Sequence, residues 1–374
     1  MRPRPARSIR DDVAVQVLAR GRVVTPDGVV FGDVVEDGGS IVDVVGVDPA
    51  ELTRSGEGEH WVCPGFIDLQ INGASGIDIT TAPHRIGDLA RLLPAEGTTA
   101  FLPTVITSSH ERRAAAIEAM ASYEHTDGAV ALGLHLEGPL LSPARTGAHD
   151  PIHLAHVASC PTASWTPENG VRLVTIAPEL PGASELIAEL VAAGVVVSVG
   201  HTDATAAEVR TGLDAGATYV THLFNAMRPF SHRAPGPIGA VLADDLVVAG
   251  LIVDGLHVDP VAVQMAWRAL GPDRITLVTD AVAARGAGDH ADGVRLADGT
   301  LAGSAITLDA ALRNLVAFTG ACVDHAVRTV TATPARVLGL DDRGVIEPGA
   351  RADVTVLDAE LRVIATFVAG ERAY

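Results

Sequence analysis

Eight short apolar runs alternate with amphipathic helical patterns along most of the chain, and this alternation limits the possible folds more than any other feature. The runs cover residues 65–71, 99–106, 130–138, 171–179, 195–201, 218–224, 247–254 and 274–280. Between them lie helical stretches such as HERRAAAIEAMASY (110–123) and ASELIAELVAAG (183–194), the second ending on a glycine as helices commonly do. Strands that alternate with helices predict repeated βα units and a parallel sheet. Eight such units predict a (β/α)8 TIM barrel of the α/β class.

The two ends of the chain show a different pattern, of short strands and turns. Residues 23–45 contain D-G and G-G hairpin signals, and the chain after about residue 344 has the same character. Because chain termini usually lie close together, we expect both ends to build one small β-sandwich domain. The predicted organisation is 1–62 for the N-terminal part of the sandwich, 63–343 for the barrel and 344–374 for the C-terminal part of the sandwich.

Charge and composition exclude several classes of function. The formal net charge of −19 would repel a phosphate polymer or an anionic membrane, so neither nucleic acid nor membrane is an expected partner. All 27 basic residues are arginine, because the sequence contains no lysine, and this excludes Schiff-base, pyridoxal-phosphate and P-loop mechanisms. A carbamylated lysine bridging two metals is excluded for the same reason. No apolar window reaches the length of a membrane span, and the basic start lacks a signal-peptide pattern, so we expect a cytoplasmic enzyme.

The three cysteines suggest neither disulfides nor a cysteine-rich zinc site. Cys63, Cys160 and Cys322 lie far apart in the sequence and form no C-x-x-C pair. We therefore expect all three to be buried thiols.

Active sites of barrel enzymes lie at the C-terminal ends of the strands. The polar residues at or near these positions are, in chain order, Gln70, Asn72, Thr104, Glu137, Glu179, His201, His222, Asp254, His257 and Asp280. A catalytic zinc site needs three protein ligands and an open position for water. Glu137, His201 and His222 offer a carboxylate and two imidazoles from three different strands. Each has a structural alternative, because a histidine at a strand end is often only hydrogen-bonded and a carboxylate can cap the next element.

The first predicted strand lacks the usual metal ligands. The stretch PGFIDLQING (64–73) resembles the first strand of metal-dependent amide hydrolases, but Gln70 and Asn72 occupy the two positions where such enzymes normally show His-x-His. Amide side chains are poor ligands for a divalent transition metal beside imidazole or carboxylate. Either the site is inactive, or its metal is held by residues further along the chain.

Longer motifs around these positions carry a resemblance to one enzyme family. They are HLEGPLLSPARTGAHDP, GHTDAT, THLFNAM, DGLHVD, LVTDA, LAGSAITLDAALRNL and ADVTVLD. Together they resemble the N-acetylglucosamine-6-phosphate deacetylases of the amidohydrolase superfamily, over nearly the whole chain from Pro64 to Asp358. In that family one branch keeps His-x-His on the first strand and can hold two metals, whereas another has Gln-x-Asn and holds one. Gln70 and Asn72 make this chain similar to the single-metal branch.

The resemblance implies a role for each matching residue of the hydrolytic centre. Glu137, His201 and His222 would bind one divalent metal ion per subunit, with zinc expected and iron, manganese or cobalt as alternatives. Asp280 would be the general base that takes the proton of water and then, as an acid, protonates the departing amine. His149 would donate to the acetyl carbonyl and stabilise the oxyanion.

The resemblance also implies how a phosphorylated amino sugar is bound. Asn225, the backbone at Ala226 and His257 would hold the sugar phosphate. Arg233 aligns with an arginine that in the family reaches the phosphate in a neighbouring subunit, which implies a homodimer. Two departures from the family pattern concern the substrate pocket: the segment after residue 280 is shorter than usual, and Thr146 replaces a basic residue.

The activity implied by the resemblance is hydrolysis of the acetamide of N-acetylglucosamine 6-phosphate to glucosamine 6-phosphate and acetate. Two kinds of alternative stay open. One is deacetylation of a related substrate, either N-acetylgalactosamine 6-phosphate or an N-acyl amino acid. The other is a non-catalytic sugar-phosphate binding protein, against which Asp280 argues because a binding protein needs no base there.

Overall fold

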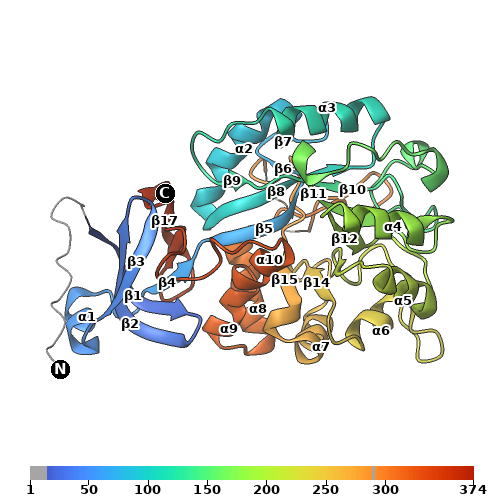
Figure 1. The fold of residues 1–374 in the computed structure, drawn as a ribbon. Coiled ribbons are helices and arrows are strands. Elements are labelled where there is room, and N and C mark those ends of the chain that lie inside the picture. The colour runs from blue at the N-terminus through green and yellow to red at the C-terminus, as the bar shows by residue number, and fades with distance from the viewer. Residues whose placement is uncertain (1–14, 289, 291) are drawn as a thin grey trace, which may run out of the picture.

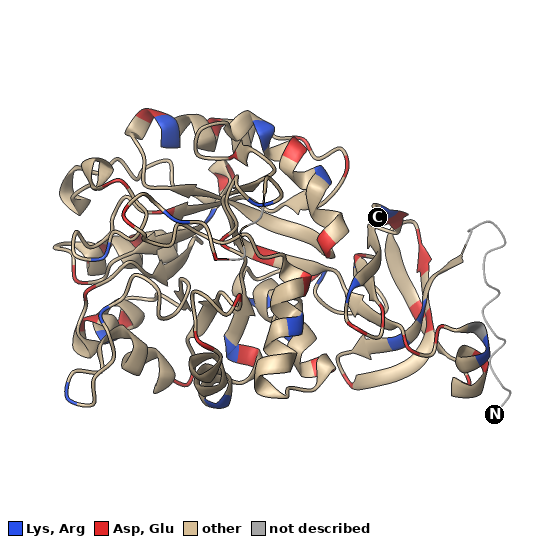
Figure 2. Cartoon of the chain, turned by 180° about the vertical axis from the view of Figure 1, so that it is seen from behind, with Lys and Arg blue, Asp and Glu red and all other residues tan. Residues whose placement is uncertain are grey.

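The computed structural model describes residues 15–288, 290 and 292–374 of the chain. Figure 1 shows a small β domain beside a larger barrel, and the C-terminus lies in the small domain next to the N-terminal strands. Figure 2 shows acidic and basic residues interspersed over both parts. Within the described residues, no helix has the length and apolar character needed to cross a membrane.

The barrel strands follow one another around the sheet in chain order, as the apolar runs predict. They are β5 (Phe66–Ile71), β8 (Thr98–Ile106), β10 (Leu134–Glu137), β11 (Val171–Ile176), β12 (Val196–Val199), β13 (Tyr219–Val220), β14 (Val248–Leu251) and β15 (Ile275–Leu277), with the short β9 (Val130–Ala131) paired to β8. All of these pairs are parallel. The ring closes between β15 and β5, where Ile71 and Ala281 form a parallel bridge and the Asp280 N–H donates to the Gln70 carbonyl at 2.9 Å. The predicted TIM barrel is confirmed.

Helices surround the barrel, and local signals in the sequence explain several of their ends. They are α2 (Ile86–Leu92), α3 (His110–Ala121), α4 (Ala183–Ala192), α5 (Ala206–Asp214), α6 (Gly236–Leu242), α7 (Pro260–Leu270), α8 (Leu308–Thr319), α9 (Val323–Arg328) and α10 (Ala332–Val337). Ser109 caps α3 through its side chain, and Thr205 and Glu208 form a capping box at the start of α5. Gly194 follows α4 with φ at 85°, which confirms the predicted glycine stop.

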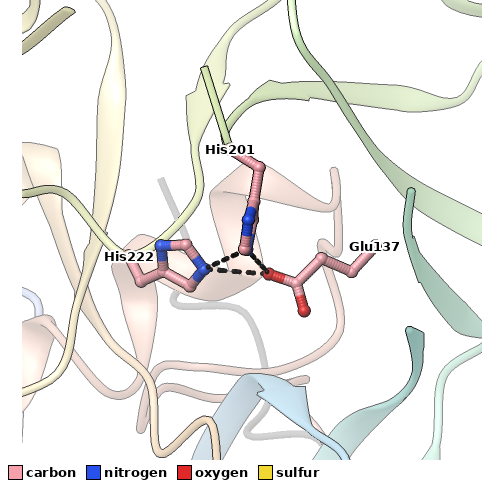
Figure 3. Close-up of side chains that lie close together, drawn as sticks. All are labelled: Glu137, His201 and His222. Carbon is pink, nitrogen blue, oxygen red and sulfur yellow. Dashed lines mark hydrogen bonds and ion pairs between the residues drawn. The ribbon is translucent and has the colours of Figure 1, made fainter. Parts of the chain in front are cut away.

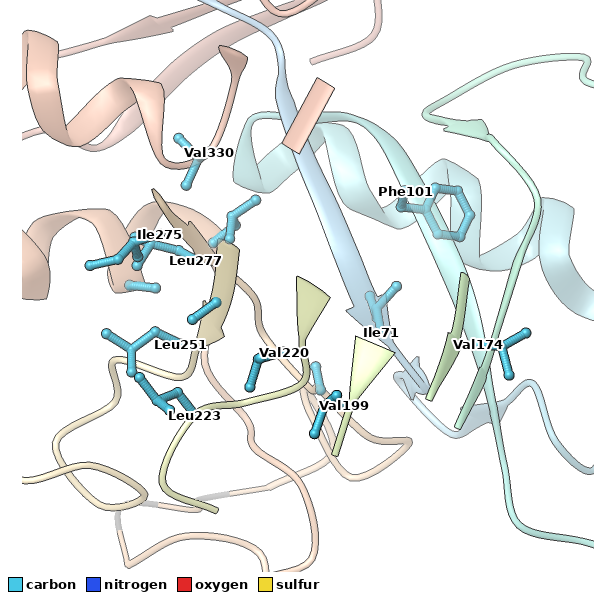
Figure 4. Close-up of a cluster of buried hydrophobic side chains, with 14 of the residues drawn as sticks. Ile71, Phe101, Val174, Val199, Val220, Leu223, Leu251, Ile275, Leu277 and Val330 are labelled. Carbon is cyan, nitrogen blue, oxygen red and sulfur yellow. The ribbon is translucent and has the colours of Figure 1, made fainter. Parts of the chain in front are cut away.

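Apolar side chains fill the space between strands and helices and also close one end of the barrel. Figure 4 shows part of the larger cluster, including Phe101 on β8 and Leu277 on β15, both fully buried. A second cluster joins residues near the starts of strands, such as Ile67 and Val248, to Leu338 just after α10. The N-terminal ends of the strands are therefore closed by apolar packing, which leaves the other end for polar chemistry.

Both chain ends build the small domain, as predicted. Its hydrogen-bonded strand order is β18 (Glu371–Arg372), β17 (Val363–Val368), β16 (Val354–Leu357), β4 (Trp61–Pro64), β1 (Gln16–Thr25), β2 (Gly28–Asp37) and β3 (Ser40–Gly46). Gly38 and Gly39 connect β2 to β3 with φ of 56° and 84°, the left-handed pair that a tight hairpin requires. The hairpin returns to the segment before β16, since the Ile41 N–H donates to the Ala350 carbonyl at 2.8 Å. The sheet thus folds around one core, while the exact boundaries 1–62, 63–343 and 344–374 stay predictions.

Two local expectations were incomplete. The helix α1 (Pro49–Ser55) interrupts the N-terminal strands, although an N-cap at Asp48 and a proline in its first turn were visible in the sequence. Among the cysteines only Cys63 is buried, whereas Cys160 is half-buried and Cys322 is exposed. Cys322 directly precedes α9, in a connection between helices rather than in a core strand. All three are free, as expected.

Candidate active site

Three buried side chains converge at the C-terminal end of the barrel. Glu137 is the last residue of β10, while His201 and His222 each follow a strand end by two residues, on β12 and β13. Glu137 Oε1 lies 2.9 Å from His222 Nε2 and 3.3 Å from His201 Nε2, and the two Nε2 atoms are 3.1 Å apart. Figure 3 shows the three side chains pointing toward one another from separate strands. Among the described residues, this is the one group of three acidic, histidine or cysteine side chains with its ligand atoms close enough to share a metal ion.

The donor set and its spacing fit a divalent ion. Tetrahedral zinc with ligands at about 2.1 Å would place its ligand atoms roughly 3.4 Å apart, which is close to the observed separations. His201 Nδ1 lies 2.9 Å from the Arg145 carbonyl, which can only accept, so Nδ1 carries the proton and Nε2 keeps its lone pair for the site. Burial lowers the pKa of His201 to about 4, which keeps this ring neutral at pH 7.

Opposing effects set the charges of the other two side chains. Burial acts to raise the pKa of Glu137, but contacts with three neighbouring imidazoles outweigh it and hold the pKa well below its usual range. Burial likewise acts to lower the pKa of His222, but contact with Glu137 and the charge of that carboxylate raise it above its ordinary value. Glu137 is therefore ionised, and its negative charge makes the centre attractive to a cation.

Backbone conformation also distinguishes this end of the barrel. His201, His222 and Asp280 have φ of 48°, 29° and 47°, in a region that residues other than glycine rarely adopt. Such a conformation costs about 1–3 kcal/mol per residue and persists only where the surrounding structure fixes it. Because strain of this kind gathers at functional sites, it is a second and independent sign that this end of the barrel performs the chemistry.

Asp280 is held by the two amides of the first strand. Its Oδ1 accepts from Gln70 Nε2 at 3.1 Å and from Asn72 Nδ2 at 2.7 Å, and Gln70 Nε2 also lies 3.0 Å from Glu137 Oε1. Gln70 Oε1 and Asn72 Oδ1 are buried with no hydrogen-bond partner. Burial, followed by the charge of Glu137, raises the pKa of Asp280 to about 6. The amide N–H groups therefore donate to carboxylates, and Asp280 is a stronger base than an ordinary aspartate.

His149 is oriented by a residue that the sequence did not single out. The Thr107 N–H donates to His149 Nδ1 at 3.3 Å, and the Thr107 hydroxyl lies 2.8 Å from the same atom. Because a backbone N–H can only donate, Nδ1 is the acceptor and Nε2 of the neutral ring carries the proton. That Nε2 lies 3.7 Å from Glu137 Oε2, beside the three converging side chains. His149 can therefore donate a hydrogen bond at the centre.

One cavity of about 410 Å³ joins these groups, a volume within the usual range for small-molecule sites. Its lining includes all the predicted site residues except one: Glu137, His149, His201, His222, Asn225, Ala226, His257 and Asp280. Arg233 is the exception, because it is exposed and borders a separate hollow with Arg228. His257 is oriented by Asp254, whose Oδ2 lies 2.6 Å from its Nδ1.

Two strand-end candidates lie elsewhere. Thr104 is buried inside β8, where its hydroxyl accepts the Ile71 N–H, because β8 continues to Ile106. Thr107 is the residue that follows the strand. The predicted run 99–106 already ended where β8 ends, so the strand-end rule would have found Thr107 had it been applied to the next residue. Glu179 does not line the cavity either. It binds the backbone and hydroxyl of residues 202–203 instead.

Comparison with known proteins agrees with this geometry. The amidohydrolase family model matches residues 61–373. This chain belongs to the amidohydrolase family. N-acetylglucosamine-6-phosphate deacetylase from Bos taurus is 38% identical over 83% of this amidohydrolase and 82% of its own length. N-acetylgalactosamine-6-phosphate deacetylase from Shewanella sp. (strain ANA-3) is 37% identical, over 83% of this chain and 84% of its own.

A solved structure extends the comparison to the fold. It is a mutant N-acetyl-D-glucosamine-6-phosphate deacetylase from Mycobacterium smegmatis in complex with N-acetyl-D-glucosamine-6-phosphate. It is 35% identical to this amidohydrolase, has a TM-score of 0.84, and covers 95% of this chain and 98% of its own. The resemblance seen in the sequence motifs is confirmed, and relatives that act on either sugar epimer lie at similar identity.

Proposed function

We propose that this amidohydrolase hydrolyses the acetamide of N-acetylglucosamine 6-phosphate, releasing acetate and glucosamine 6-phosphate. One observation carries the proposal: a cavity of sugar size has Glu137, His201 and His222 converging on one point, with Asp280 and His149 in the same cavity. The relatives named for this activity, and the homologous structure that binds this sugar phosphate, supply the substrate class.

The three converging side chains would hold one divalent ion per subunit, with zinc as the expected metal. A divalent ion there would polarise the acetyl carbonyl and make water a better nucleophile. The two imidazoles and one carboxylate are a usual ligand set of catalytic zinc. Gln70 and Asn72 offer no ligand to a second ion, because both direct their N–H groups at carboxylates.

Asp280 would move the proton in both halves of the reaction. Its Oδ1 is fixed by two amide donors, which leaves Oδ2 to accept the proton of the attacking water. The protonated Asp280 would then give that proton to the departing amine, which leaves poorly unless it is protonated. His149, with its proton on Nε2, would hydrogen-bond the acetyl oxygen as negative charge develops there.

Recognition of the phosphate would need a second copy of the chain. Among the described residues that line the cavity there is no arginine, and three of them are carboxylates: Asp78, Glu137 and Asp280. These charges would repel a phosphate unless a cation compensates them. Arg233 lies exposed on the loop after β13, outside the cavity of its own chain. We therefore propose a homodimer in which Arg233 reaches the neighbouring site, beside Asn225, Ala226 and His257 of that site.

A cytoplasmic location is part of the same proposal. A charged sugar phosphate crosses a lipid bilayer only at a high cost in free energy. We therefore expect the enzyme to be in the same compartment as its substrate, which we propose is the cytoplasm.

The galactosamine epimer is the second candidate substrate. The Shewanella relative named for N-acetylgalactosamine 6-phosphate is nearly as similar as the bovine relative, so overall similarity does not separate the two sugars. An N-acyl amino acid has no comparable support. A non-catalytic binding protein would need no base in the cavity, so the fixed carboxylate of Asp280 argues against that alternative.

The decisive experiment is an acetate-release assay of the zinc-loaded protein. The substrates would be the two N-acetylhexosamine 6-phosphates, unphosphorylated N-acetylglucosamine and N-acetylmethionine. We expect N-acetylglucosamine 6-phosphate to have the highest kcat/KM. A higher kcat/KM for the galactosamine epimer would make that sugar the proposed substrate. If no substrate released acetate, the assignment as an enzyme would be refuted.

A further inference from the structure

Glu179 lies three residues after β11 and does not line the cavity. Its two carboxylate oxygens bind the segment that follows His201: the Thr202 hydroxyl donates to Oε2 at 2.6 Å and the Asp203 N–H donates to Oε1 at 2.7 Å. The residues directly after His201, a proposed metal ligand, are thus fixed by the segment that follows the neighbouring strand β11. This arrangement places the side chain of Asp203 at the junction of several loops.

Asp203 connects the loops that follow three different strands. Its Oδ1 accepts from Arg145 Nε at 2.8 Å, and its Oδ2 accepts from Arg228 Nη2 at 2.8 Å. Arg145 lies in the loop after β10, which continues to His149. Arg228 lies in the loop after β13, just beyond the cavity residues 225–226. One carboxylate therefore holds two walls of the cavity to the segment after β12.

The same loops are also joined through the main chain around His201. The Arg145 carbonyl lies 2.9 Å from His201 Nδ1, so Arg145 binds Asp203 with its side chain and His201 with its backbone. The Thr202 N–H donates to the Ala226 carbonyl and the Arg228 N–H donates to the Thr202 carbonyl, both at 3.0 Å. The contact of Arg145 with Asp203 therefore helps to fix the loop residue whose carbonyl orients the His201 ring.

We propose that Asp203 is a positioning residue, which holds the Arg145 carbonyl against His201 and the 225–228 loop against the cavity. The inference rests on the proposed function, because it takes His201 as a metal ligand. Groups that bind metal-bound histidines directly typically change metal affinity by about 10- to 100-fold when they are removed. Here that group is the carbonyl of Arg145, a residue whose side chain Asp203 holds. Asp203 should therefore affect both metal affinity and the binding of substrate, although it touches neither.

The test is Asp203→Asn in the full-length protein, which keeps the shape but removes the charge that holds the two arginines. A matched control exists on α2, where Asp88 also receives one arginine on each oxygen, from Arg85 and Arg91. Asp88 lies outside the cavity lining, so Asp88→Asn removes an equivalent ion-pair bridge at an unrelated place. Zinc dissociation constants would be measured by competition with a chromophoric chelator, together with kcat, KM and the unfolding midpoint.

We expect Asp203→Asn to weaken zinc binding at least about tenfold and to raise KM for the sugar phosphate several-fold, with Asp88→Asn within about twofold of wild type in both. Arg145→Gln should weaken zinc binding similarly, and the double variant should be no weaker than the worse single one, because both remove one contact. If Asp203→Asn fails to fold, Arg145→Gln alone provides the test, since its side chain is partly exposed.

Outcomes against the proposal are distinct from failure of the proposed function. A wild-type protein that binds zinc and releases acetate, together with variants at residues 145 and 203 that keep wild-type zinc affinity and KM, would overturn the positioning role alone. An equal loss in Asp88→Asn would also overturn it. A wild-type protein that neither binds zinc nor releases acetate would overturn both.

Discussion

Replacing Asp280 by asparagine separates the chemical role of this residue from its structural one. In the protein, Oδ1 accepts hydrogen bonds from Gln70 Nε2 and Asn72 Nδ2, so an amide oxygen at the same place would keep both contacts. The amide nitrogen would then replace Oδ2, the oxygen proposed to accept the proton of water. Packing and both hydrogen bonds are preserved, and what is lost is the ability to accept a proton.

The size of the effect follows from that single loss. Positioned general acids and bases contribute about 100- to 10,000-fold to turnover, which corresponds to roughly 2.7–5.5 kcal/mol of transition-state stabilisation. Because Asp280 would serve as base and then as acid, we expect Asp280→Asn to lower kcat at least about a hundredfold. Zinc content should survive, since the three converging ligand atoms come from other residues.

The assay is acetate release by the zinc-loaded variant, with zinc measured by elemental analysis of the same sample. Asp78→Asn is the matched control, because Asp78 also lines the cavity and its Oδ1 accepts only the Thr81 N–H, a contact that an amide oxygen keeps. We expect the kcat of this control, measured at saturating substrate, to stay within about threefold of wild type. If Asp280→Asn turned over at a rate near wild type, or if both variants lost activity equally, proton transfer by Asp280 would be refuted.

Three further predictions concern the metal, the subunit interface and the core. Elemental analysis should find close to one tightly bound divalent ion per chain, and two would contradict the donor role of Gln70 and Asn72. Arg233→Ala should raise KM for the phosphorylated sugar by an amount worth about 2 kcal/mol and leave use of the unphosphorylated sugar unchanged. Mixing that variant with Asp280→Asn should restore activity if the arginine acts across the interface, whereas no recovery would place it elsewhere. Phe101→Ala should lower the free energy of unfolding by about 3–5 kcal/mol, measured by urea titration, because its fully buried ring lies in the main cluster.

The fold was predictable because the barrel strands are buried on both faces. In β5 all six residues are buried and four of them are apolar, although Asp68 and Gln70 interrupt the run before the polar residue Asn72 that follows the strand. The position of Glu137, His201 and His222 then follows from the rule that barrel sites lie at the C-terminal strand ends. Each of these residues lies at or just after the end of a strand, so the local pattern is sufficient to find it.

The partners that orient these residues were not predictable in the same way. The proton on His149 is placed by the backbone N–H of Thr107, and the ring of His201 is oriented by the carbonyl of Arg145. Every residue has a backbone N–H or carbonyl group, so the residue types in the sequence do not indicate where such contacts form. Asp203 and Arg145 are 58 positions apart in the chain, and they make contact because the fold brings the loops after β10 and β12 together. Such contacts depend on the closed barrel and have no local signal.

Gln70 and Asn72 show how a missing motif can itself carry chemical meaning. Each amide faces carboxylate oxygens, and only its nitrogen can do so favourably, because an amide oxygen turned toward Asp280 or Glu137 would add repulsion between acceptors. The N–H groups, which carry partial positive charge, therefore lie beside the two carboxylates. A cation placed there would meet donors instead of lone pairs, so the first strand favours neutral hydrogen bonding over a second ion. The same two side chains hold Asp280 in place without neutralising it, which leaves the carboxylate free to exchange a proton. Replacement of His-x-His by Gln-x-Asn is thus compatible with hydrolysis by a single ion, provided that Glu137, His201 and His222 hold it.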